Sequence, residues 1–237
     1  MSKNLPNDQE TAIAVIPARG GSKGIAKKNL APLLGIPMLA YSIRAAQDCA
    51  RIIETIVSTD DVEIAKCATV EGATVVKRPP DLATDTSPTE PAVVHALDWW
   101  KERKGVDPDW IVLLQPTSPL RNSSDVTAAF KVQEDAGADS VLSVEEKREF
   151  RWRQDGSGGL PLWDIQNRPR RQELTPDYVE NGAIYISRPS FYREKNNRLG
   201  GKIGLYIMPP ERCLDVDTPF DIWLVEQYLK HDREGKS

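Results

Sequence analysis

The chain has 237 residues, of which 40% are hydrophobic and 28% are charged, a composition typical of a globular protein with a core of ordinary size. Its formal net charge of −4 argues against a general attraction to nucleic acid or to an anionic membrane surface. The three cysteines, Cys49, Cys67 and Cys213, form no C-x-x-C pair, which disfavours a disulfide framework or a zinc site and predicts a cytoplasmic protein. Residues 1–10 are polar and no run approaches 18 apolar residues, so we expect neither a signal peptide nor a membrane span.

The first predicted strand, over residues 13–17, runs into a basic loop with glycines at positions 20, 21 and 24. Glycine lets the backbone approach a ligand closely, and successive N–H groups in such a loop can form an anion site. The loop and its continuation also carry positive charge on Arg19, Lys23 and Lys28. Neither common phosphate-binding pattern, GxxxxGK[ST] or GxGxxG, is present. An ordinary surface turn therefore remains the alternative to phosphate binding for this stretch taken alone.

Strands and helices then alternate along the chain. Apolar runs predict strands over 53–58, 73–77, 110–114 and 139–144. Amphipathic periodicity and end signals predict helices over 37–50, 61–72, 92–104 and 124–136, the second of them capped by Asp60 or Asp61. This alternation predicts an α/β fold with a mostly parallel sheet and right-handed crossovers. The loops that follow strands, at 18–29, 59–61, 78–89 and 115–121, should then converge on one edge of the sheet, which favours a ligand site there.

Residues 145–178 interrupt this alternation with arginines, aromatic residues and glycines, and predict an inserted excursion of irregular strands. The rings of Trp152 and Trp163 favour a packing partner, which self-association of two chains would supply. A solvated basic loop and a groove for single-stranded nucleic acid are the alternatives. The net negative charge disfavours the second of these.

The C-terminal part returns to strand patterns over 181–187 and 203–208 and ends in a predicted helix over 220–229. Before that helix, Asp215 and Asp217 stand two residues apart, a spacing that places both carboxylates on one face of an extended segment. Two carboxylates and substrate phosphates suit Mg²⁺. The alternative is a turn in which Asp217 caps the following helix.

Seven short motifs occur along the chain in order. They are Ala18-Arg19-Gly20-Gly21-Ser22-Lys23-Gly24 with Lys28-Asn29, Ser58-Thr59-Asp60, Leu82-Ala83-Thr84-Asp85, Leu114-Gln115-Pro116-Thr117-Ser118-Pro119-Leu120-Arg121, Arg171-Gln172, Asn181-Gly182-Ala183-Ile184-Tyr185 and Asp215-Val216-Asp217-Thr218. Together they resemble the motifs of the acylneuraminate cytidylyltransferases, also called CMP-sialic acid synthetases, over about residues 12–230. The Ser-Lys-Gly-Ile form of the loop is more similar to the neuraminate and legionaminate enzymes than to the 3-deoxy-manno-octulosonate branch.

The resemblance implies a three-layer Rossmann-like nucleotidyltransferase fold. It implies one nucleotidyltransferase domain over residues 1–237, with 145–178 as a dimerisation arm. It also implies that CTP and a nine-carbon 2-keto sugar acid react to give the CMP-sugar and pyrophosphate, with Mg²⁺ as cofactor and a homodimer as the working form. The anomeric hydroxyl would attack the α-phosphate, and the basic loop would neutralise the departing pyrophosphate.

The resemblance also assigns roles to single residues. The residues that would face the nucleotide are Ala18, Arg19, Gly20, Ser22, Lys23, Lys28, Asn29, Arg78 and Thr84. Those that would face the sugar acid are Gln115, Thr117, Ser118, Arg171, Gln172 and Asn181, with Arg171 reaching into the site of a partner chain. Asp215 and Asp217 would hold Mg²⁺, and the candidate catalytic residues are Arg19, Lys28, Asp215 and Asp217.

The chain departs from the family pattern near position 150, where no proline precedes a basic sugar-binding residue and several cations could take that role. Ala26 stands where proline is common in the family. Two alternatives follow for the function. One is a cytidylyltransferase of the same fold for another keto-sugar acid, such as pseudaminate. The other is a non-catalytic nucleotide-binding module, which the presence of the two aspartates, Arg19 and Lys28 disfavours.

Overall fold

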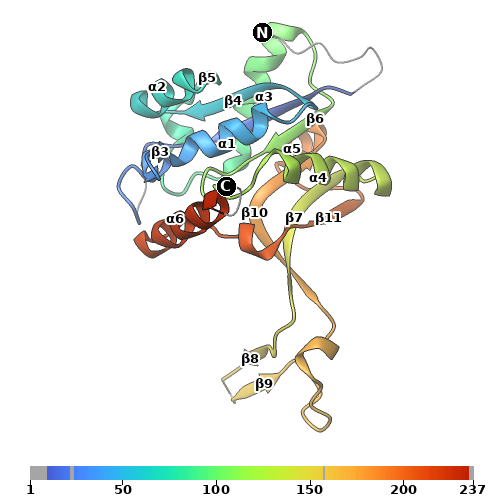
Figure 1. Cartoon of the computed structure of the whole chain (residues 1–237). Helices are drawn as coiled ribbons and strands as arrows, with labels where there is room; N and C mark the ends of the chain where they lie inside the picture. The colour runs from blue at the N-terminus through green and yellow to red at the C-terminus, as the bar shows by residue number, and fades with distance from the viewer. Residues whose placement is uncertain (1–9, 22–23, 157, 235–237) are drawn as a thin grey trace.

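The computed structural model describes residues 10–21, 24–156 and 158–234, and its centre is a seven-stranded sheet in the order β11-β7-β10-β6-β1-β4-β5 (Figure 1). The strands are β1 (Ala12–Pro17), β4 (Ile52–Thr59), β5 (Thr74–Lys77), β6 (Trp110–Leu113), β7 (Ser140–Lys147), β10 (Asp177–Ser187) and β11 (Ile203–Ile207). Strand β10 is antiparallel to its neighbours β6 and β7, and the other neighbouring pairs are parallel. The predicted α/β fold with a mostly parallel sheet is therefore confirmed.

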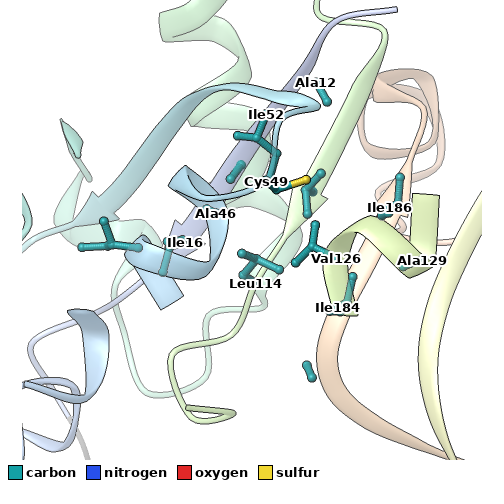
Figure 2. Packing of buried hydrophobic residues seen from close by; sticks show 14 of the residues in the cluster. Ala12, Ile16, Ala46, Cys49, Ile52, Leu114, Val126, Ala129, Ile184 and Ile186 are labelled. Atoms are coloured by element: carbon teal, nitrogen blue, oxygen red, sulfur yellow. The ribbon is translucent and has the colours of Figure 1, made fainter. Parts of the chain in front are cut away.

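Helices cover both faces of the sheet, because strand side chains alternate between two apolar layers. In β1, Ala12, Ala14 and Ile16 belong to one layer, and Ile13 and Val15 belong to the other. The first layer packs against α1 (Met38–Gln47), α2 (Val62–Val70) and α4 (Ser123–Ala136), and the second packs against α3 (Thr89–Lys104) and α5 (Pro189–Lys195). Figure 2 shows side chains of the first layer gathered in one packed cluster.

Local signals explain most of the helix boundaries. Helix α2 begins where the sequence predicts, because the Asp61 carboxylate accepts hydrogen bonds from the backbone N–H groups of Glu63 and Ile64 at 2.7 and 2.9 Å. Helix α3 begins earlier than predicted, at Thr89, because a proline in the first turn, Pro91, costs no helical hydrogen bond. Helix α5 is not predicted by the sequence, since its seven residues are too few for a clear apolar period.

The C-terminal helix α6 (Pro219–Glu234) lies beside a pair of two-residue strands, β2 (Pro32–Leu33) and β3 (Ile36–Pro37). A third apolar cluster joins them, and its buried members are Leu33, Met38, Leu120, Val216 and Val225. Thr218 and Asp221 cap the helix reciprocally: the Thr218 N–H donates to the Asp221 carboxylate at 2.7 Å, and the Asp221 N–H donates to the Thr218 hydroxyl at 3.3 Å. The alternative in which Asp217 caps this helix is therefore wrong.

An arm between β7 and β10 extends away from the sheet (Figure 1). It contains the hairpin β8 (Trp152–Gln154) and β9 (Gly159–Pro161) and the turn η3 (Arg171–Glu173). The Trp163 ring lies edge-on to Phe150 and Trp152, with centroids 5.2 and 5.9 Å apart. The tryptophans thus find packing partners within the arm itself, yet Trp152 is still 54% exposed. In the described ranges no helix is both long and apolar enough to cross a membrane.

Candidate active site

The loops after the parallel strands meet in an open cleft of about 500 Å³, as the sequence predicts. Three loops supply most of its lining: the glycine loop after β1, the loop after β5 and the loop after β6. Its lining includes Arg19, Gly21, Gly24, Lys28, Asn29, Arg78, Asp85, Ser87, Thr89, Gln115, Thr117 and Asp217. Convergence at the carboxyl edge of the sheet therefore brings together side chains that are up to about 200 residues apart in the chain.

The glycine loop is held by contacts with neighbouring loops. Ala18 is buried, and its N–H donates to the carbonyl of Ser58 at 3.0 Å. The Gly20 N–H donates to the Asp60 carboxylate at 3.0 Å. An added Cβ on Gly20 would come within 2.8 Å of the Asp61 carboxylate, so only glycine allows this approach. Ser22 and Lys23, both expected to face the nucleotide, lie outside the described residues.

Arg19 extends from this loop across the cleft. Its Nη1 donates to the carbonyl of Thr84 at 2.5 Å and lies 3.1 Å from the Asp85 carboxylate. The Asn29 side-chain amide donates to the Arg19 carbonyl at 3.0 Å, which fixes the backbone from which the guanidinium projects. Arg19 therefore presents a positive charge that is already balanced by a carboxylate.

Arg78 supplies a second, more deeply placed cation. It is 5% exposed, and its guanidinium donates to the Ser58 hydroxyl at 3.1 Å and to the Ser58 carbonyl at 2.6 Å. Burial lowers the pKa of the guanidinium, while the nearby Asp60 carboxylate raises it. An arginine whose unperturbed pKa exceeds about 12 stays charged despite such a shift.

Lys28 and Asp217 form the third charged group. The Lys28 Nζ donates to the Asp217 carboxylate at 3.0 Å and to the carbonyl of Val216 at 2.9 Å. The Lys28 side chain is 17% exposed and that of Asp217 is 74% exposed. The ammonium is thus fixed at the cleft wall, while most of the Asp217 carboxylate remains open to solvent and to ligands.

Asp215 precedes Asp217 by two residues and lines a second hollow, while Asp217 lines the cleft. Partial removal from water raises the pKa of the Asp215 carboxyl, a hydrogen bond from Thr117 lowers it, and the Asp217 carboxylate raises it further. The Val216 side chain is completely buried between the two aspartates, and its N–H donates to the carbonyl of Thr117 at 2.8 Å. Two like charges held close together in this way favour a bound cation.

The second hollow, of about 380 Å³, contains Asn181 and Asp215 in its lining. The Asn181 carboxamide accepts a hydrogen bond from the Ser143 hydroxyl at 2.6 Å and donates to the Cys213 sulfur at 3.2 Å. Gly182 follows at φ +75°, and a Cβ there would lie 2.6 Å from the Gln115 side-chain oxygen. The two hollows are therefore neighbours across Gln115 and the aspartate segment.

Of the predicted site residues that the structure describes, six line neither hollow: Ala18, Gly20, Thr84, Ser118, Arg171 and Gln172. Thr84 contributes its carbonyl to Arg19 but does not line the cleft, and Ser118 is only 1% exposed. Arg171 and Gln172 lie in the arm, where the Arg171 Nε donates to the Arg148 carbonyl at 2.8 Å. Of the described residues that line the cleft, none comes from the arm.

Comparison with known proteins agrees with this geometry. A family model described as "Cytidylyltransferase" matches residues 13–199. The chain belongs to the cytidylyltransferase family. It is 38% identical over 221 residues to an N-acylneuraminate cytidylyltransferase A of Danio rerio, covering 90% of this chain and 50% of that protein. It is 32% identical over 222 residues to the post-translational flagellin modification protein B of Campylobacter coli, covering 92% and 94% respectively.

The resemblance to the acylneuraminate cytidylyltransferases is thus confirmed at the level of the family, although the chain spans about half the length of most of the curated relatives compared with it. A solved CMP:2-keto-3-deoxy-manno-octonic acid synthetase complexed with CTP shares the fold, with a TM-score of 0.67 at 20% identity. The superposition covers 94% of this chain and 99% of that structure. The Rossmann-like nucleotidyltransferase fold is therefore confirmed.

Sequence reasoning missed several cleft residues in this cytidylyltransferase-family chain. Asp85, Ser87 and Thr89 line the cleft but are not among the predicted site residues. Asp60, predicted only as a candidate helix cap, does not line the cleft and instead accepts a hydrogen bond from the Gly20 N–H. Both aspartates directly follow residues at a strand end or a short turn, so their position at the carboxyl edge could have signalled them. Their partners, Gly20 and Arg19, could not be read from the sequence because they depend on how the loops meet.

Proposed function

We propose that this chain is a cytidylyltransferase that joins CTP to a nine-carbon 2-keto sugar acid of the N-acetylneuraminate or legionaminate type. The products would be the CMP-sugar and pyrophosphate. The observation that carries this proposal is the meeting of three cations, Arg19, Lys28 and Arg78, with Asp217 in one cleft. Such an arrangement can bind a triphosphate and stabilise the charge that develops when pyrophosphate leaves.

On the nucleotide side, the glycine-loop backbone, Asn29 and the three cations would bind CTP. Arg19 and Lys28 are each paired with a carboxylate of the chain itself. The triphosphate would replace Asp85 as the partner of Arg19 and would share Lys28 with Asp217. A charge-assisted contact between a guanidinium and a phosphate is stronger than an exposed ion pair, so this exchange favours binding.

On the sugar side, Gln115 and Thr117 line the cleft, and Asn181 lies in the adjoining hollow. These amide and hydroxyl groups would orient the sugar acid so that its anomeric hydroxyl faces the α-phosphate. Positioning of this kind contributes much of the rate enhancement in phosphoryl and nucleotidyl transfer. Ser118 is buried and Gln172 lies in the arm, so neither would contact the sugar acid from within the cleft of its own chain.

Asp215 and Asp217 would hold Mg²⁺, because two adjacent carboxylates on an extended segment are oxygen donors of the kind that this cation prefers. When bound, Mg²⁺ supplies positive charge that stabilises the phosphates in the transition state. Lys28 would balance the remaining charge of Asp217, and the Thr117 hydroxyl would orient Asp215.

The arm would join two copies of the chain as a homodimer. Its apolar residues Leu160, Leu162 and Ile165 are between 50% and 56% exposed, although the arm has an aromatic cluster of its own. Arg171 is too far along the arm to line the cleft of its own chain and would instead reach the site of the partner. We place the reaction in the cytoplasm, which suits three cysteines, Cys49, Cys67 and Cys213, that form no disulfide in the described part of the chain.

Gly182→Ala tests the sugar side. A Cβ at φ +75° is strained and would also collide with Gln115. We expect a loss of about 1–2 kcal/mol of stability and a clear rise in KM for the sugar acid, with KM for CTP nearly unchanged. Gly105→Ala is the matched control, because Gly105 has φ +81° with no neighbour within 4 Å, so it should lose similar stability without affecting substrate use. Equal kinetic effects in the two variants would contradict a role for Gln115.

The function as a whole is tested by pyrophosphate release from CTP and Mg²⁺ with a panel of acids. The panel comprises N-acetylneuraminate, legionaminate, pseudaminate and 3-deoxy-manno-octulosonate. Turnover with one of the first two is the expected result. Turnover with pseudaminate alone would favour the alternative acceptor, and binding of CTP without turnover on any acid would favour a non-catalytic module.

A further inference from the structure

We propose that Asp125, a residue outside the cleft, is a positioning residue that fixes the aspartate segment 213–217 through Arg212. The inference rests on the proposed function, because it takes Asp215 and Asp217 as the metal-binding pair. Neither the family comparison nor the motifs assign a role to Asp125 or Arg212.

Asp125 is completely buried in the first turn of α4 and accepts four hydrogen bonds. Arg212 supplies two of them, from Nη2 at 2.6 Å and from Nε at 3.1 Å. The Tyr206 hydroxyl donates at 2.7 Å and the Asn122 backbone N–H at 3.0 Å. Both oxygens of this carboxylate accept two hydrogen bonds each, and two of the four come from one planar guanidinium. Such a contact holds the Arg212 side chain in a single orientation.

The segment that Arg212 introduces is held by tertiary contacts and not by regular secondary structure. After the turn η4 (Pro210–Arg212), the described chain forms neither strand nor helix until α6 begins at Pro219. Between these points the Val216 N–H donates to the carbonyl of Thr117, and the Val216 side chain is buried. Asp215 therefore lies between fixed points on both sides: Arg212 and Cys213 precede it, and Val216 follows it. The contact with Asp125 fixes the position of Arg212, where the segment begins.

The charge of Asp125 also acts on Arg121, whose guanidinium holds the other half of the site. Arg121 is 2% exposed, and its guanidinium donates to the carbonyls of Gln115 at 3.1 Å and Ala183 at 3.2 Å. Burial lowers the pKa of Arg121 to about 10, and the charge of Asp125 opposes that shift. Asp125 is thus hydrogen-bonded to the arginine at the start of the aspartate segment, and its charge also favours the charged form of the buried arginine next to the Gln115 loop.

A role in stability alone does not account for this arrangement. Buried ion pairs are often replaceable by apolar residues without loss of stability, because desolvation offsets their attraction. A buried ion pair whose carboxylate accepts its full set of hydrogen bonds does, however, fix the relative position of its two side chains. Residues that orient metal-binding groups from outside the site commonly alter metal affinity about 10- to 100-fold when they are changed.

The test uses Arg212→Lys in the 237-residue chain, since Lys keeps the charge and loses the contact of two guanidinium nitrogens with one carboxylate. The probe is Mn²⁺ with CTP present, and the readout is the free Mn²⁺ signal in electron paramagnetic resonance. We expect the apparent Kd for Mn²⁺ to rise about 10-fold or more, with kcat for pyrophosphate release largely restored at saturating metal and with metal-free CTP binding unchanged. Tyr206→Phe is the matched control, because it removes one hydrogen bond from the same carboxylate without touching segment 213–217.

Each outcome has a distinct meaning. An Arg212→Lys protein that binds Mn²⁺ as tightly as the wild type overturns the inference and leaves the proposed function intact. If Tyr206→Phe weakens Mn²⁺ binding as much as Arg212→Lys does, the inference is also overturned. The effect would then come from any disturbance of the buried surroundings of Asp125 and not from the contact with Arg212. If Asp125→Asn folds, it should weaken Mn²⁺ binding at least as much as Arg212→Lys. A wild-type chain that binds Mn²⁺ with CTP but transfers no nucleotide would overturn the proposed function alone.

Discussion

Replacing Asp217 by Asn is expected to reduce pyrophosphate release about 10³-fold while tightening the binding of CTP in the absence of metal. The carboxylate is 74% exposed at the cleft and lies 3.0 Å from Lys28. Losing about 4 kcal/mol of metal-dependent charge stabilisation corresponds to the expected fall in rate. Without metal the same carboxylate repels the triphosphate and occupies Lys28, so its removal should tighten CTP binding by about two- to fivefold, as for an exposed ion pair.

The two effects have opposite signs and are measured separately, by a coupled pyrophosphate assay and by calorimetric titration with CTP in a chelator. Asp221→Asn is the matched control, because Asp221 is a nearby carboxylate that caps α6 and does not line the cleft. It should lose about 1 kcal/mol of stability and keep turnover within a few-fold of the wild type. An Asp217→Asn protein that retains a tenth of the wild-type rate would contradict a metal-binding role.

The fold was predictable because its signals are local. The strand that precedes the glycine loop and the strand that precedes Gln115 are apolar on both faces, as expected for parallel strands covered by two layers of helices. The Asp61 cap and the glycine after α4 set helix ends through contacts only a few residues apart. The exception is the arm, where an aromatic cluster forms between residues that no regular period relates.

The site was predictable only in part. That Arg19, Lys28 and Arg78 share a cleft follows from strand order, because each stands in a loop that follows a parallel strand. The place of Asp217 in the same site was expected only from the resemblance to the family. Which groups pair with one another does not follow from strand order. The Lys28–Asp217 contact joins residues 189 positions apart, and the Arg19–Asp85 pair depends on the path of a proline-rich loop. The hydrogen bonds between Arg212 and Asp125 could not be predicted from the sequence. An aspartate that caps a helix has the same sequence context whether or not an arginine from another part of the chain binds it.

Replacing Lys28 by Met is the second change from which we expect a large effect, a fall in kcat/KM of about 10²- to 10³-fold. Lys28 is held at 17% exposure by the Val216 carbonyl and the Asp217 carboxylate, so its charge is already oriented before substrate binds. Oriented charges of this kind, in a site partly shielded from water, are worth about 3–4 kcal/mol in the transition state. Lys28→Arg should rescue only partly, because the planar guanidinium cannot reproduce a point charge between a carbonyl and a carboxylate.

Lys27, the neighbour of Lys28, provides a control that distinguishes an effect of charge inside the cleft from an effect of the protein's net charge. Lys27 pairs with Glu63 at 2.5 Å, and both side chains are more than half exposed, so Lys27→Met removes the same charge from the protein without altering the cleft. We expect that variant to keep kcat/KM within about twofold, as is usual for an exposed ion pair. If both variants lost activity equally, and the loss disappeared at high salt, the effect would be long-range attraction of CTP by net charge. The alternative outcome is that Lys28→Met still has a reduced kcat/KM at high salt while Lys27→Met keeps the kcat/KM of the wild type. That outcome would require that the Lys28 ammonium act on the leaving pyrophosphate from its fixed position beside Asp217.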